Sequence, residues 1–226
     1  MFAPMNATDR MIYEIVSAIL CFILVKFMIK PYQLTGKKSY ISLPLGFFFL
    51  GISSVIAAIA YSPLDLGSKF LYLPLLTRTY SFVFLAISYF FSNRFSKKGQ
   101  LFADLTVSLL FVILAIFLIL TFVAPDFALT SYSEANAYLR IISIASLCYI
   151  VIYTLRSHVR NPDPTTIWIP FGFVFLAISQ YSLLFWYIDS SYSAFLGSLL
   201  TRWIGLTFFL FVAYHTFYTS SDKKDG

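Results

Sequence analysis

The sequence predicts an all-α integral membrane protein, built as one bundle of seven transmembrane helices. The chain of 226 residues is 59% hydrophobic and only 12% charged, whereas a soluble domain averages about 25% charged residues. Each of seven apolar segments contains the ~20 residues that a helix needs to cross about 30 Å of hydrocarbon. None has the strict alternation that barrel strands show. The segments cover residues 11–30, 41–61, 70–92, 101–123, 136–157, 166–188 and 194–218.

The first segment is expected to remain as a helix in the mature protein. Asp9 and Arg10 precede it in place of a basic cluster, and its apolar run is longer than that of a typical signal peptide. Residues 1–226 are therefore expected to form a single membrane domain, because almost no chain is left outside the segments.

The basic residues predict an external N-terminus and a cytoplasmic C-terminus in a multi-pass protein of the cell membrane. Only Arg10 and Lys69 lie outside the apolar runs on the predicted outer side. The net charge of +6 is thus mainly a topology signal, and its dispersal over short turns argues against nucleic-acid binding. The basic residues of the predicted inner side are Lys30, Lys37, Lys38, Arg94, Lys97, Lys98, Arg156, Arg160, Lys223 and Lys224.

An internal repeat divides the chain into two similar halves. Residues 43–54 (LPLGFFFLGISS) return as residues 169–180 (IPFGFVFLAISQ), with seven of the twelve pairs identical, and LLTR at 75–78 reappears at 199–202. The pattern predicts repeat one over 11–92, repeat two over 135–219, and the apolar segment 101–123 as an unduplicated linker facing lipid. Copies four helices apart keep one orientation, so the repeat is parallel.

A bundle of three, one and three helices with an external N-terminus resembles the SWEET and PQ-loop transporters. More distantly it is similar to microbial opsins and other seven-helix receptors. The resemblance covers the whole chain, concerns architecture, and implies transport or reception. The Pro-Gln dipeptide of the PQ-loop group is absent, and the last segment has no lysine for a retinal. The sequence therefore predicts no cofactor, and the resemblance assigns no functional residue.

Four ionisable residues are predicted to lie at one level inside the outer part of the membrane. In three helices such a residue precedes the basic residue at the inner end by sixteen positions, or about 24 Å of helix. The fourth residue is placed by the repeat, since it is the partner of Arg78. The four are Glu14 before Lys30, Arg78 before Arg94, Arg140 before Arg156, and Arg202.

Two structural readings and one functional reading of this charged layer stand side by side. Each repeat could close its own Asp–Arg pair through Asp65 and Asp189, which are 124 residues apart, or the arginines could extend to the outer headgroups. Glu14 is the obvious partner for one arginine. The functional reading is an externally open pocket for an anionic or polyhydroxyl solute, because a planar guanidinium holds carboxylate or phosphate in two bonds.

Fewer polar residues lie deeper in the predicted membrane. Gln180, Ser53 and Ser179 are candidates for lining a path, although serines in membranes commonly bond helices together. Pro44 and Pro170, near the inner starts of their helices, are candidate hinges at an inner gate. No catalytic motif or metal-binding cluster is recognisable, so neither an enzyme nor a metal site is expected.

The leading functional hypothesis is a small-solute transporter or permease whose outer mouth is formed by Arg78, Arg202, Arg140 and Glu14. One alternative is a seven-helix sensory or receptor module that signals through a partner protein. Another is an accessory subunit of a larger membrane complex. The expected partners are thus the lipid bilayer, a small polar or anionic solute, and a second membrane protein.

Overall fold

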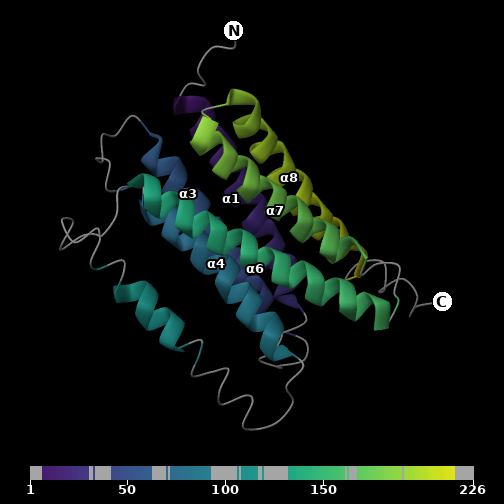
Figure 1. Cartoon of the computed structure of the whole chain (residues 1–226). Coiled ribbons are helices and arrows are strands. Elements are labelled where there is room, and N and C mark those ends of the chain that lie inside the picture. The colour runs from purple at the N-terminus through teal and green to yellow at the C-terminus, as the bar shows by residue number, and fades with distance from the viewer. Residues whose placement is uncertain are drawn as a thin grey trace.

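Long helices make up the computed structural model, which describes residues 7–30, 33, 42–62, 70, 72–92, 106, 108–116, 119, 132–160, 162, 167–189 and 191–216. Six of the described helices are long and apolar enough to cross a membrane. The chain is thus a helical, multi-pass membrane protein (Figure 1). The six are α1 (Ala7–Met28), α3 (Ser42–Ala60), α4 (Tyr72–Ser92), α6 (Tyr132–Arg160), α7 (Trp168–Asp189) and α8 (Tyr192–Tyr214).

These helices coincide with six of the seven predicted segments, and the main differences lie at the ends. α1 begins at Ala7 and carries Asp9 in its first turn. α6 spans 29 residues, with Glu134 in its first turn and Arg160 in its last. Acidic residues near a helix N-terminus and basic ones near its C-terminus interact favourably with the helix dipole. Polar turns therefore extend both helices beyond their apolar runs.

The fourth predicted segment, 101–123, is described only in part. Residues 108–116 are helical and form a seventh helical segment in the described chain. Phe111 packs against Phe49 of α3 and against Tyr80 of α4, at ring-centroid distances of 5.6 and 5.8 Å. Val112 is 54% exposed. This segment thus lies on the outside of α3 and α4, with an apolar face left for lipid.

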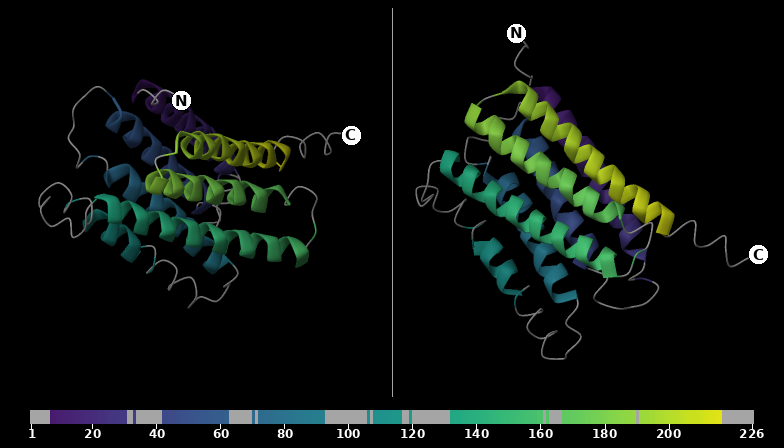
Figure 2. Two further views of the ribbon diagram at one scale, coloured as in Figure 1. Left: turned by 45° about the horizontal axis from the view of Figure 1, so that its top comes forward. Right: turned by 45° about the vertical axis from the view of Figure 1, so that its right-hand side comes forward.

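The six long helices form a closed ring in chain order. Each packs against the helix before and after it, and α8 returns to α1. The helices run side by side, with α1, α4, α6 and α8 directed one way and α3 and α7 the other (Figures 1 and 2). We call the end where α1, α4, α6 and α8 begin the N-terminal end of the bundle, and the other the C-terminal end. The predicted charged layer lies toward the N-terminal end.

An apolar core fills the ring toward the C-terminal end. Phe173 of α7 stacks edge-on against Phe209 of α8 at 4.7 Å, and Phe47 of α3 meets the same ring at 5.1 Å. All three side chains are buried, together with Leu24 of α1 and Ile150 of α6. This core therefore closes the centre of the ring below the charged layer.

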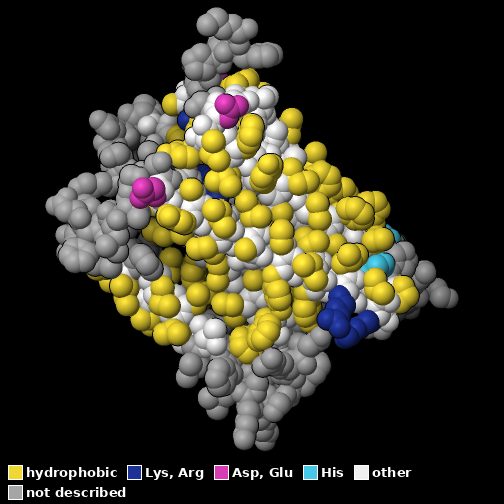
Figure 3. Space-filling view, viewed as in Figure 1, with side chains coloured by type: hydrophobic (Ala, Val, Ile, Leu, Met, Phe, Trp, Pro, Cys, Tyr) yellow, Lys and Arg dark blue, Asp and Glu magenta, His cyan; other side chains and the backbone are white. Residues whose placement is uncertain are grey.

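The outer surface of the bundle is suited to lipid. Figure 3 shows a broad apolar face with acidic side chains near one end and basic ones near the other. Ile152 of α6 is 67% exposed and Ile188 of α7 is 74% exposed. A contiguous apolar surface of this kind indicates contact with a membrane.

Glycines allow close approach between neighbouring helices. A Cβ added to Gly205 of α8 would lie 2.9 Å from the carbonyl oxygen of Gly172 in α7. The Phe209 ring covers Gly172, and the Leu85 side chain covers Gly46 in the same way. The α7–α8 contact thus depends on the missing side chain of Gly205.

Replacing Gly205 with alanine should destabilise the bundle. The new methyl group would press on a backbone oxygen that cannot turn aside, and overpacking of this kind costs about 1–3 kcal/mol. Gly197→Ala is the matched control, because nothing lies within 4 Å of a Cβ at that position of the same helix. Thermal unfolding in detergent measures both variants. Equal melting temperatures for the two would contradict this account of the contact.

Candidate anion-binding site

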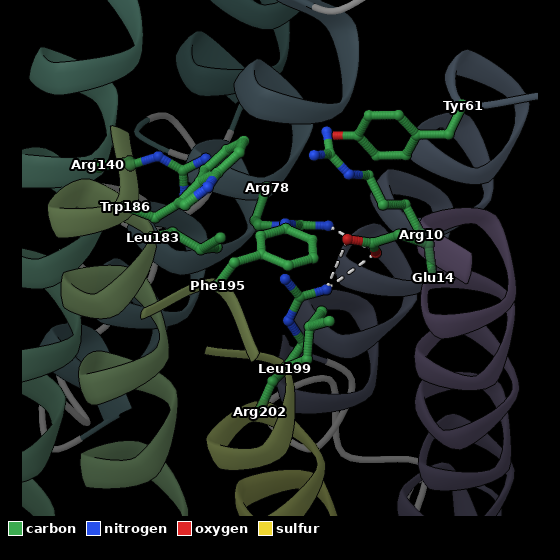
Figure 4. Close-up of a pocket in the computed structure, with 10 residues that line it drawn as sticks. All are labelled: Arg10, Glu14, Tyr61, Arg78, Arg140, Leu183, Trp186, Phe195, Leu199 and Arg202. Carbon is green, nitrogen blue, oxygen red and sulfur yellow. Dashed lines mark hydrogen bonds and ion pairs between the residues drawn. The ribbon is translucent and has the colours of Figure 1, made fainter. Parts of the chain in front are cut away.

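Glu14 joins three helices through two buried arginines. Its carboxylate accepts a hydrogen bond from Nη2 of Arg78 at 2.9 Å, and Nη1 of Arg202 donates to its two oxygens at 2.8 and 2.9 Å. The three side chains come from α1, α4 and α8, and each residue is at most 8% exposed. Figure 4 shows both guanidinium groups directed toward the carboxylate. One carboxylate thus holds two cations, where the sequence suggested a partner for one.

Helix periodicity explains why these side chains face inward. Glu14 shares its face of α1 with Ser17, Ala18 and Cys21, all of them buried, at the three- and four-residue spacing of a helix face. Arg202 belongs to a similar inward face of α8. Because every neighbour along these faces packs into the ring, the charged side chains reach the centre and not the headgroups.

Arg140 of α6 lies at the cavity wall and is held by neutral amides. Its Nε donates to Asn136 Oδ1, one helical turn earlier, and its Nη1 donates to Gln180 Oε1 of α7 at 3.4 Å. Both amide side chains are buried. Gln180 therefore supports the charged layer by holding one of its arginines.

Arg10 of α1 forms part of the wall, surrounded by aromatic rings. Its guanidinium carbon lies 5.1 Å from the Phe195 ring centroid, 5.3 Å from that of Trp186 and 5.9 Å from that of Tyr61. A cation within about 6 Å of a ring face is attracted by the ring quadrupole. Trp186 belongs to α7, Phe195 to α8, and Tyr61 follows the end of α3, so Arg10 and its cage close the site over Glu14 (Figure 4).

These residues enclose a cavity of about 30 Å³, lined by Arg10, Glu14, Tyr61, Arg78, Arg140, Leu183, Trp186, Phe195, Leu199 and Arg202. One water needs about 10–15 Å³, and an apolar cavity of about 150 Å³ holds benzene. The hollow thus suits one or two waters or a small ion. Among the described residues of the lining, four arginines against one glutamate give a formal charge of 4 − 1 = +3.

Three of these arginines retain unused donors. The Nε groups of Arg10, Arg78 and Arg202 are buried and have no hydrogen-bond partner among the described residues. An unpartnered donor of a buried cation is costly in a low-dielectric site. Each of these three arginines therefore retains a buried donor whose hydrogen-bonding capacity the described residues leave unmet.

The remaining predicted site residues are not on the cavity wall. Ser53 donates to the carbonyl oxygen of Pro74 at 2.8 Å, which bonds α3 to α4. Ser179 is buried, and its hydroxyl has no partner among the described residues. Pro44 and Pro170 are buried at the third positions of α3 and α7, whose helical hydrogen bonding continues beyond them. There a missing N–H costs little.

One alternative expected Arg202 to form an ion pair with Asp189 of the same repeat, and Arg202 does not form that pair. This arginine binds Glu14 of the other half, and Asp189 is exposed at the end of α7. Asp65 lies outside the described residues. The two arginines therefore share a partner across the ring.

Sequence reasoning missed Arg10, Asn136 and the aromatic cage. Arg10 carried a usable signal, because it precedes Glu14 by four residues and so shares its helix face. The three cage rings carried none, since aromatic residues are abundant throughout this chain.

Within the described residues, no three His, Cys, Asp or Glu side chains lie close enough together to hold a metal ion. Comparison of the chain with protein-family models, with curated proteins and with solved structures gave no match. The arginine–glutamate cluster itself is thus the basis for assigning a function.

Proposed function

We propose that this membrane protein is a transporter for a small anionic solute, which binds in the cavity beside Glu14. The observation that carries the proposal is the excess of three positive formal charges among the described residues that line the cavity. Charges at such depth are expensive in a membrane and normally mark a substrate or ion pathway. A purely structural network would need only enough arginine to neutralise Glu14.

The dimensions of the cavity favour an anion over a polyhydroxyl solute. A volume of about 30 Å³ is far below that of a sugar ring, given that benzene needs about 150 Å³. The unused groups at Arg10, Arg78 and Arg202 are all donors. They suit acceptor oxygens or a halide and offer nothing to the hydrogens of a hydroxyl group.

Transport further requires that the ring of helices adopt two conformations, which open the cavity to opposite sides of the membrane in turn. We propose that the halves are parallel repeats that rock against each other, with the N-terminus external and the cavity facing outward. Two matched contacts support equivalent halves: Leu85 covers Gly46, and Phe209 covers Gly172. Leu85 and Phe209 are 124 residues apart, which is also the separation of the paired arginines Arg78 and Arg202. Pro44 and Pro170 would be hinges, and Gln180 and Ser179 would line the opened path.

Flux across vesicles tests the proposal. Purified protein in liposomes is expected to take up acetate or chloride down a gradient. The double variant Arg78→Ala, Arg202→Ala should reduce uptake to that of empty vesicles, because it removes both guanidinium groups from the cavity. Arg156→Ala is the matched control, since Arg156 is exposed near the C-terminal end of α6. Equal flux with and without the two cavity arginines would overturn the proposal.

One observation favours a receptor as the second candidate. The core around Phe47, Phe173 and Phe209 closes the ring beneath the cavity, so a ligand could bind there without passing. A receptor would be stabilised by acetate or chloride in detergent and would give no flux in liposomes. Binding with flux separates the transporter from this alternative.

A further inference from the structure

The lining of the cavity beside Glu14 combines two kinds of side chain. Arg10, Arg78, Arg140 and Arg202 are cationic, whereas Leu183, Trp186, Phe195 and Leu199 are apolar or aromatic. Leu183, Phe195 and Leu199 form a buried cluster, with Trp186 packed against it. A ligand that suits this lining therefore combines a negative charge with an apolar part.

We propose that the ligand is a short-chain aliphatic monocarboxylate, which replaces the Glu14 carboxylate between Arg78 and Arg202. This inference rests on the proposed anion-binding function and specifies its substrate class. The alkyl end of the ligand lies against Leu183, Phe195 and Leu199. Glu14 is thus an internal ligand that occupies the site when no solute is bound.

The bonds of Glu14 itself identify the group that the arginines recognise. Its oxygens accept one bond from Arg78 and two from Arg202, at 2.8 to 2.9 Å, which is the length of charge-assisted bonds. A free carboxylate presents the same two oxygens in the same plane. Sulfate or phosphate carries further oxygens that would meet the side chains of Leu183, Phe195 and Leu199, which have no hydrogen-bond donor, and would incur the cost of an unpaired buried polar group.

Arg10 provides a place for the displaced Glu14 carboxylate. It precedes Glu14 by one helical turn on α1, it also lines the cavity, and its Nε is buried without a partner among the described residues. With a second carboxylate bound, the lining holds four arginines and two anions, so its formal charge is 4 − 2 = +2. The exchange therefore leaves neither carboxylate without a cation.

The volume limits the length of the ligand. The cavity offers about 30 Å³, and withdrawal of Glu14 adds the space of its carboxylate. Cavities that hold six carbon atoms measure about 150 Å³. Formate, acetate and propionate are therefore expected to fit, and affinity should fall from butyrate onward because the chain would press on Leu183 and Phe195.

Removal of the internal ligand tests the exchange. Glu14→Ala and Glu14→Gln should bind acetate with a dissociation constant at least about tenfold lower than that of wild type, because a tethered competitor acts at high effective concentration. Binding is measured by calorimetry in detergent over the series from formate to hexanoate, with sulfate and phosphate alongside. Glu134→Ala is the matched control, an exposed glutamate in the first turn of α6.

If Glu14→Ala is too unstable for calorimetry, acetate should raise its melting temperature more than that of wild type, and should not do so for Arg202→Ala. Acetate binding no tighter in Glu14→Ala or Glu14→Gln than in wild type would overturn the exchange. Sulfate binding as tight as acetate binding would overturn the monocarboxylate class and leave anion binding intact. Absence of any response to acetate or chloride, in wild type and variants alike, would overturn the proposed function itself.

Discussion

Replacing Glu14, Arg78 and Arg202 together, by leucine and two methionines, is expected to leave the bundle at least as stable as wild type and to abolish its response to anions. The three side chains meet in the ring with each residue at most 8% exposed. Well-packed apolar replacements of a buried charge network are often neutral or stabilising by about 1–4 kcal/mol, because no charge then has to be desolvated. Thermal unfolding in detergent, with and without acetate, measures both effects.

The single variant Glu14→Leu is the necessary comparison. It leaves two buried arginines without their shared carboxylate, and removal of one partner from a buried network costs about 3–5 kcal/mol. A network retained for function should therefore give a large loss in the single variant and little or none in the triple. A triple variant as unstable as the single one would mean that these charges are required to hold the fold together.

A thiol at the cavity wall is expected to react preferentially with anionic reagents. The site is Tyr61→Cys, at the end of α3 beside Arg10, in a Cys148→Ala background that removes the exposed native thiol. A cavity lined by an excess of three positive charges concentrates anions and repels cations. Fields of this kind change local concentrations and association rates by about 10- to 1,000-fold.

The measurement compares a sulfonate-bearing and a trimethylammonium-bearing methanethiosulfonate. Their rate ratio at Tyr61→Cys, divided by the ratio at Ser62→Cys, should favour the sulfonate by about tenfold or more. Ser62 is the neighbouring residue and is not part of the cavity lining. A normalised ratio near one would show that the positive charge of the lining does not change the local concentration of ions at residue 61.

Much of the fold followed from composition and spacing. Apolar runs located six long helices to within a few residues, because a membrane-spanning helix must satisfy all its backbone bonds internally. The spacing of sixteen residues from the basic end of each helix placed Glu14 and Arg78 at one level, and the structure joins them at 2.9 Å. The depth of a residue in the membrane can thus be predicted from its distance along the helix to the basic residue that marks one end.

Direction around the helix axis was harder to predict. Ser53 and Gln180 were expected to line a path, and spacing along the helix did not indicate that Ser53 donates to a backbone oxygen of α4 or that Gln180 accepts from Arg140. Which neighbour a polar side chain meets depends on how the helices rotate as they pack. For the same reason the cage around Arg10 could not be inferred, since its rings come from three separate parts of the chain with no shared spacing.

The position of Glu14 in the chain has a consequence for biogenesis. Its two cationic partners follow it by 64 and 188 residues. At a synthesis rate of about 5–20 residues per second, Arg202 leaves the ribosome about 10–40 s after Glu14. The Glu14 carboxylate can therefore gain its second cation only after α8 has been synthesised. Packing of α8 against α1 then closes the ring around the charged cluster.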